Sequence, residues 1–99
     1  MPVPLSTNLS DPGAIPYFLW DEPMTVLALR ERLRTASRPE AARLLGKILR
    51  EARDPDVWLF TTPAEVVARW DDLASHLGRR RPFWDFLLSR WREEGLLDP

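Results

Sequence analysis

The chain has 99 residues, lacks cysteine entirely and contains a single histidine. Without cysteine there can be no disulfide scaffold, no thiolate zinc site and no cysteine nucleophile. His76 could meet Asp72, four residues earlier, on one helical face, but a catalytic histidine needs a positioned partner. Because a lone histidine near the C-terminus of a helix more often interacts with the helix dipole, we expect no catalytic residue.

Glycine is also scarce, with four residues, most of them at expected helix ends. A glycine-rich phosphate loop, a G-x-S-x-G elbow and an H-E-x-x-H motif are all missing. The acidic residues include three adjacent pairs, and neighbouring side chains on a helix point about 100° apart, so such pairs do not converge on one metal ion. We therefore expect no cofactor, no metal site and no enzymatic activity. The pairs are Asp21-Glu22, Asp71-Asp72 and Glu93-Glu94.

Long apolar runs and an excess of one charge are missing as well. No segment approaches the roughly 20 apolar residues that cross a bilayer, and the N-terminus lacks the basic and apolar regions of a signal peptide. Fourteen basic residues against fifteen acidic ones give a net charge of −1, far from the positive field of a chain devoted to nucleic acid. We expect a soluble, cytoplasmic protein.

What the chain does contain is proline near its start and helical periodicity afterwards. Residues 1–16 hold four prolines, and proline cannot join a helical ladder, so we expect an extended N-terminal arm there. The run PYFLWDEP that follows is too short for a full helix and too apolar for a solvated tail. It should dock onto the body or onto a partner, and residues 17–99 should form a single helical domain.

Start and stop signals predict four helices. Thr25 caps TVLALRERLRTA, and Ser37 with Glu40 has the S-x-x-E spacing of a capping box at the start of SRPEAARLLGKILREAR. The segment DPDVWLF that follows should be a short helical turn or a loop with its aromatic side chains tucked inward.

Thr62 caps the third predicted helix, TPAEVVARWDDLASHL, and Gly78 should end it. The fourth should begin at residue 81 or 82 and run to Glu94. No segment alternates with period two. The chain is therefore predicted to be all-α, a compact bundle of about four helices with short connections.

The fourth helix belongs to the stretch GRRRPFWDFLLSRW, residues 78–91. Three consecutive arginines lie at its N-terminus, where the helix dipole disfavours cations, which suggests phosphate or the carboxylates of a second chain as partners. Apolar residues form two neighbouring rows along the helix, an arc too wide for one contact. Three interpretations stay open: a core helix with a solvated basic end, a protein interface, and a nucleic-acid-binding surface.

Tryptophan and arginine are the residues most enriched at interface hot spots, and the chain carries five tryptophans. The core of a chain this short cannot easily enclose all five tryptophans. We therefore expect Trp20 and either Trp84 or Trp91 to be exposed. The aromatic N-terminal run and the last helix would then cover a groove on a partner. The predicted partner-binding residues are Tyr17, Phe18, Trp20, Arg79, Arg80, Arg81, Trp84 and Trp91.

Four short motifs carry a resemblance: Trp20-Asp21, Asp56-Val57-Trp58, Arg81 with Phe83-Trp84, and Trp91 with Gly95. With these motifs, spread over residues 17–97, the chain resembles a group of small bacterial helical proteins. These are typically encoded beside nucleotidyltransferase-type toxins of the abortive-infection class. The resemblance implies a non-enzymatic antitoxin or accessory protein that binds the neighbouring toxin, and it carries over no catalytic residue. The basic recognition helix of DNA-binding antitoxins is missing.

We therefore expect a protein-binding module, with a nucleotidyltransferase-type toxin as its partner. The alternative is a small nucleic-acid-binding transcriptional regulator that places Arg79, Arg80 and Arg81 on phosphates, and such binding would fall steeply with salt. The oligomeric state stays open at this point.

Overall fold

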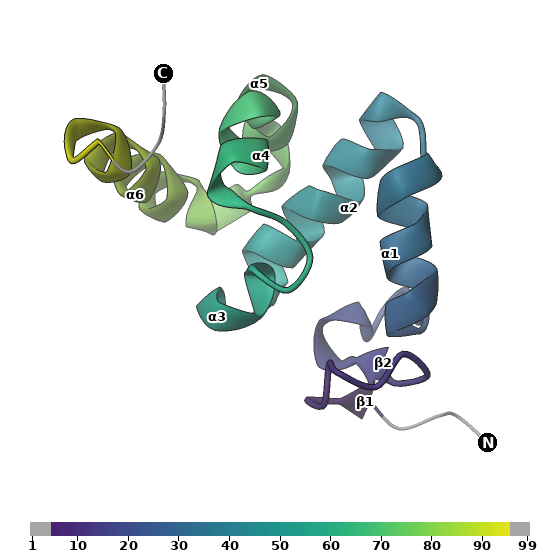
Figure 1. Ribbon diagram of the computed structural model, residues 1–99. Coiled ribbons are helices and arrows are strands. Elements are labelled where there is room, and N and C mark those ends of the chain that lie inside the picture. The colour runs from purple at the N-terminus through teal and green to yellow at the C-terminus, as the bar shows by residue number, and fades with distance from the viewer. Residues whose placement is uncertain (1–4, 96–99) are drawn as a thin grey trace.

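The computed structural model describes residues 5–95 and confirms the predicted helical class (Figure 1). Within these residues the structure has six α-helices, three short 3-10 helices and one two-stranded parallel sheet. The α-helices are α1 (Val26–Thr35), α2 (Arg38–Glu51), α3 (Asp54–Val57), α4 (Pro63–Ala68), α5 (Trp70–Leu73) and α6 (Arg81–Glu93). The other elements are β1 (Leu5–Ser6), β2 (Ile15–Pro16), η1 (Tyr17–Leu19), η2 (Ala74–His76) and η3 (Gly78–Arg80).

The N-terminal segment is not the extended arm that its prolines suggested. Leu5 of β1 pairs in parallel with Ile15 of β2, so the chain folds back on itself within residues 5–16. Leu9, inside this loop, is 4% exposed and belongs to the hydrophobic core. The prediction is wrong because proline excludes a helical ladder but is compatible with turns. Residues 1–4 of the predicted arm lie outside the described residues.

α1 and α2 begin at the caps that the sequence predicts. The Thr25 hydroxyl accepts the backbone N–H of Ala28 at 3.1 Å, and the Ser37 hydroxyl accepts that of Glu40 at 3.4 Å. Each bond satisfies an amide that the first helical turn leaves without a partner. The Glu40 carboxylate does not complete the capping box, because it accepts from Arg43 at 2.7 Å instead.

α2 lies at the centre of the molecule, between α1 on one side and α3, α5 and η2 on the other (Figure 1). Its predicted apolar stripe is confirmed, since Leu44, Leu45, Ile48 and Leu49 are each exposed by 2% or less. Full burial of a leucine or isoleucine side chain contributes roughly 1.5–3 kcal/mol. This one helix therefore supplies a large part of the apolar core that holds the others in place.

The predicted third helix is interrupted at Arg69, which has a φ of −103° and a ψ of 9°, outside helical geometry. This is one reason why the described residues contain more than the four predicted helices. Val66 before the break and Leu73 after it are both fully enclosed, so core packing outweighs helix continuity. Gly78, predicted as the stop signal, has a φ of 53°, the left-handed conformation that glycine adopts at helix ends.

Gly46 brings α2 and η2 into close contact. A Cβ atom at position 46 would lie 2.5 Å from the Cβ atom of His76, which is well inside the van der Waals separation of two carbon atoms. Glycine is thus required by the close approach of a neighbouring segment. Arg50 holds the same two elements together, since its Nη1 donates to the His76 carbonyl at 2.8 Å.

We expect Gly46→Ala to destabilise the protein, although alanine is favoured over glycine in a helix interior by about 1 kcal/mol. Overpacking of this kind typically costs about 1–3 kcal/mol, and chemical denaturation followed by circular dichroism measures the change. The variant His76→Gly removes the opposing Cβ atom, so Gly46→Ala should cost clearly less in that background. A Gly46→Ala protein as stable as the parent contradicts the close approach.

Candidate functional site

The two apolar rows of α6 have different environments. One row is buried, because Trp84 is fully enclosed and Leu88 is only 3% exposed. The neighbouring row, Phe83, Leu87 and Trp91, is divided, because Phe83 is 38% exposed whereas Leu87 and Trp91 are half-buried against the core. Phe86, which belongs to neither row, is 63% exposed. α6 lies at the opposite end of the molecule from α1 (Figure 1), and both Phe83 and Phe86 remain in contact with solvent there. We call the solvent-exposed side that carries Phe83 and Phe86 the outer α6 face.

Trp84 anchors α6 to the body. Its indole Nε1 donates to the carbonyl of Leu49 in α2 at 2.9 Å, and its ring packs edge-on against Trp58 with the centroids 5.7 Å apart. The predicted exposure of Trp84 is therefore wrong, and its fully enclosed side chain offers no surface to a partner. Trp91, the other candidate, is half-buried, with its ring centroid 5.7 Å from that of Trp58.

The arginine triplet divides into one paired and two exposed residues. Arg80 donates from Nη2 to Asp54 at 2.5 Å, and its guanidinium lies 4.5 Å from the centroid of the Phe83 ring. Arg79 and Arg81 are exposed, and neither forms an ion pair with any carboxylate of residues 5–95. Arg80 is thus part of the fold, whereas the two flanking arginines are free to meet a ligand.

The aromatic run before α1 docks onto the body of the protein, which is one of the two outcomes predicted for it; the other was docking onto a partner. Tyr17 donates from its hydroxyl to Asp56 at 2.6 Å, and the same hydroxyl accepts the backbone N–H of Arg53 at 2.7 Å. Burial, followed by the hydrogen bond to Asp56, raises the pKa of Tyr17 above its ordinary value. Phe18 is 1% exposed and meets Phe60 edge-on in the core. Phe18 is therefore enclosed and offers no surface to a partner, whereas Tyr17 is half-buried and its hydroxyl is engaged within the fold.

Trp20 is the exception in this run, because 64% of it is exposed, in agreement with the prediction. The folded N-terminal segment and α6 lie on opposite sides of an elongated molecule that measures 48 × 25 × 23 Å (Figure 1). The single surface expected from the N-terminal run and the last helix is therefore not formed. Two separate exposed aromatic surfaces take its place.

The acidic pair after Trp20 ties this segment to α2. Glu22 accepts from both terminal nitrogens of Arg43, at 2.6 and 3.0 Å, and from Lys47 Nζ at 3.2 Å. Asp21 also accepts from Lys47, whose side chain is only 6% exposed. A buried ammonium group needs such paired carboxylates to offset its lost hydration. The hydrogen bonds from Arg43, and then those from Lys47, lower the pKa of Glu22 to about 2.

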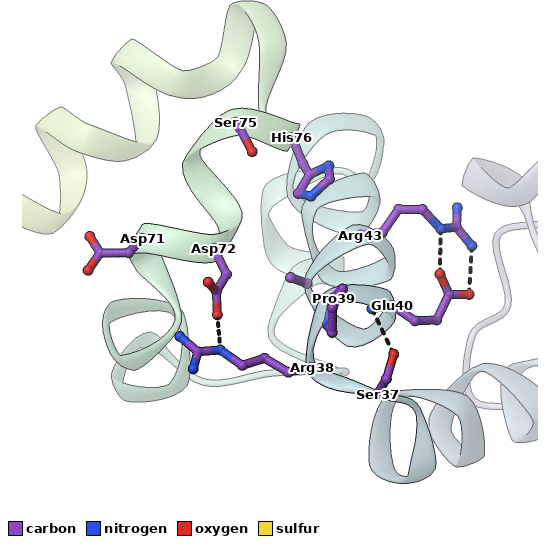
Figure 2. A pocket seen from close by; sticks show the side chains of 10 residues that line it. Ser37, Arg38, Pro39, Glu40, Arg43, Asp71, Asp72, Ser75 and His76 are labelled. Atoms are coloured by element: carbon purple, nitrogen blue, oxygen red, sulfur yellow. Dashed lines mark hydrogen bonds and ion pairs between the residues drawn. The ribbon is translucent and has the colours of Figure 1, made fainter.

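An open cleft of about 660 Å³ lies between the start of α2 and the α5–η2 segment (Figure 2). Asp72 turns toward Arg38, which donates to it from Nε at 2.5 Å, and away from the imidazole of His76 (Figure 2). The His76–Asp72 pair that catalysis would use is not formed. The 5–95 segment also contains no group of histidine, aspartate and glutamate side chains able to hold a metal ion. The cleft is lined by Ser37, Arg38, Pro39, Glu40, Ala42, Arg43, Asp71, Asp72, Ser75 and His76.

Comparison with known proteins adds no family to this picture. No protein-family model, no curated protein and no solved structure matches the chain. None of the described helices combines the length and the apolar character needed to span a membrane. The outer α6 face is the candidate site that the geometry itself supplies. The sequence analysis missed Phe83 and Phe86 because it chose the two tryptophans of α6, Trp84 and Trp91, as the binding residues.

The Glu22 contacts predict a loss of stability in acid. Because the folded pKa of about 2 lies below the ordinary value of 4.5, the stabilisation is complete above pH 4.5 and is lost as the pH falls toward 2. The shift corresponds to at most roughly 3–4 kcal/mol, and solvent screening reduces this because 27% of the Glu22 side chain is exposed. Urea unfolding of the parent and of Glu22→Gln at pH 7 and pH 3 measures it.

The Glu22→Gln protein should be less stable at pH 7, and its stability should depend less on pH than that of the parent. Glu51→Gln alters an exposed glutamate at the end of α2 and serves as the control, with little change expected. If the free energy of unfolding depends on pH in the same way for the parent and for Glu22→Gln, the proposed role of Glu22 is ruled out.

Proposed function

We propose that this protein is a non-enzymatic protein-binding module whose contact surface is the outer α6 face. The supporting observations are the pair of solvent-exposed rings, Phe83 and Phe86, and the exposed, unpaired arginines 79 and 81 at the N-terminal end of the same helix. Phenylalanine and arginine side chains are enriched at protein interfaces relative to the rest of the surface. α6 is also held in place by the buried side chains of Trp84 and Leu88. Binding therefore costs little conformational entropy, because the helix is already ordered.

The same residues favour a protein over a nucleic acid as the ligand. Stacking of bases requires aromatic faces that are open within a basic groove. Arg80 covers the Phe83 ring, and the exposed acids Asp85 and Glu93 reduce the positive field along the helix. The net charge of −1 gives no long-range attraction for phosphate.

The chemistry of the face indicates a partner with an apolar groove bordered by carboxylates. A nucleotidyltransferase-type toxin, the partner implied by the sequence resemblance, would offer such carboxylates where it holds its metal ions. Arg79 and Arg81 would pair with them, whereas Arg80 stays with Asp54. The protein would then neutralise or escort the toxin by covering its groove. A second contact through Trp20, at the other end of the molecule, stays a prediction.

The test is co-purification of the chain with the product of the neighbouring reading frame, followed by a measured affinity. Phe83→Ala/Phe86→Ala should weaken binding at least about tenfold, since hot-spot truncations cost more than about 1 kcal/mol each. Arg79→Ala/Arg81→Ala should weaken it and also reduce its dependence on salt. Leu27→Ala alters an equally exposed apolar residue of α1 and should leave the affinity unchanged.

A titration against duplex DNA at two salt concentrations separates the alternative function. We expect no binding that falls steeply with salt. Steep salt-dependent DNA binding that is lost in Arg79→Ala/Arg81→Ala, together with no capture of the neighbouring protein, would refute the proposed function in favour of the regulator.

A further inference from the structure

The outer α6 face carries a regular pattern that partner binding does not explain. The residues on it are spaced alternately by four and three positions, the spacing of the seam of a coiled coil. Arg79 belongs to η3, which runs directly into the first residue of α6. All five residues are exposed, and the four that belong to α6 lie on the side of the helix away from Trp84 and Leu88. The seam consists of Arg79, Phe83, Phe86, Arg90 and Glu93.

The seam is complementary to the same seam of a second copy of the chain when the two helices run antiparallel. With a two-fold axis at Phe86, an antiparallel second copy sets Arg79 opposite Glu93, and it sets Phe83 opposite Ser89, next to Arg90. The first pairing joins opposite charges. The second places a guanidinium beside an aromatic ring, which is a favourable contact. The two Phe86 rings meet at the axis, where offset or edge-to-face packing buries both.

The helix dipole favours the same arrangement. Arg79 lies next to the positive N-terminal end of α6 and Glu93 at its negative C-terminal end, and both positions oppose the dipole. No ion pair joins either residue to another within residues 5–95. An antiparallel neighbour brings each of these charges beside a charge and a dipole end of the opposite sign, so a second copy removes both conflicts.

We infer that α6 pairs with α6 of a second copy of this chain in an antiparallel homodimer, through the outer α6 face. This goes beyond the proposed function, because it needs no protein other than the chain itself. A 13-residue helix is about 20 Å long, so the interface is at the small end of specific contacts and its dissociation constant should be micromolar. The dimer would cover the surface proposed for the partner, so the two would compete.

Sedimentation equilibrium of the purified full chain, from about 5 to about 500 µM, tests the inference. The mass should rise from that of one chain toward that of two. Phe86→Glu sets two carboxylates against each other at the axis and should raise the dissociation constant at least about tenfold. Leu27→Glu makes the same kind of change at a residue of α1 that is 64% exposed, and it should dimerise like the parent. Circular dichroism checks that each variant is folded.

The antiparallel register is tested by reversing charges. Arg79→Glu and Glu93→Arg should each weaken the dimer, because each removes both symmetry-related ion pairs. Their combination restores opposite charges across the axis and should recover most of the lost affinity. A mass of one chain over the whole range overturns the inference, and so does a combined variant that is no tighter than either single variant.

The two proposals fail in different ways. A chain that is monomeric at every concentration and still captures its partner overturns the homodimer and leaves the proposed function standing. A dimer that follows the charge reversals but captures no partner supports the homodimer and refutes the proposed function. Arg81, which lies off the seam, separates them further: Arg81→Ala should weaken partner binding and leave the dimer unchanged.

Discussion

The burial of Trp84 against α2 determines what α6 shows to solvent. Its indole N–H reaches the Leu49 carbonyl, and its ring packs on Trp58 inside the core. Neighbouring side chains on a helix point about 100° apart, so once Trp84 faces inward, Phe86 must face outward. The outer α6 face thus faces solvent because Trp84, on the other side of the same helix, occupies the core. Both proposals depend on this one orientation.

α2 in turn supports the position of Trp84. It provides the carbonyl that the indole uses, the apolar stripe beneath the other elements, and the glycine that lets η2 approach closely. It also carries Lys47, the most enclosed charged side chain of the core region, whose two carboxylate partners hold the segment after η1. The same helix therefore joins the N-terminal and C-terminal parts of the molecule. Substitutions at Gly46 or Glu22 test how firmly other segments pack onto α2, which also positions α6.

Local signals in the sequence predicted the local features well. The caps at Thr25, Ser37 and Thr62 and the left-handed glycine at position 78 are confirmed, because each depends on a few neighbouring residues. The break at Arg69 could not be predicted, since neither glycine nor proline marks it. The folding back of the N-terminal segment could not be predicted either, because it depends on the packing of Leu9 against core residues that are distant in the sequence.

The candidate site was predicted only in part for the same reason. Two apolar rows on α6 were visible in the sequence, but periodicity does not say how deeply each residue of a row is buried. Pairing of Arg80 with Asp54 and of Tyr17 with Asp56 spans 26 and 39 residues, so no local pattern could have removed them from the predicted partner-binding set. Trp20, whose exposure was predicted, and Arg79 and Arg81 remain on the surface.

Hydrogen exchange of the tryptophan indole protons, followed by NMR in heavy water, measures the orientation of α6 directly. The Trp84 Nε1 proton is hydrogen-bonded and fully enclosed, so it should exchange most slowly of the five, close to the rate of global unfolding. The Trp20 proton should exchange fastest. A Trp84 proton that exchanges as quickly as that of Trp20 would show that α6 is turned or detached, and the outer α6 face would then lose its physical basis.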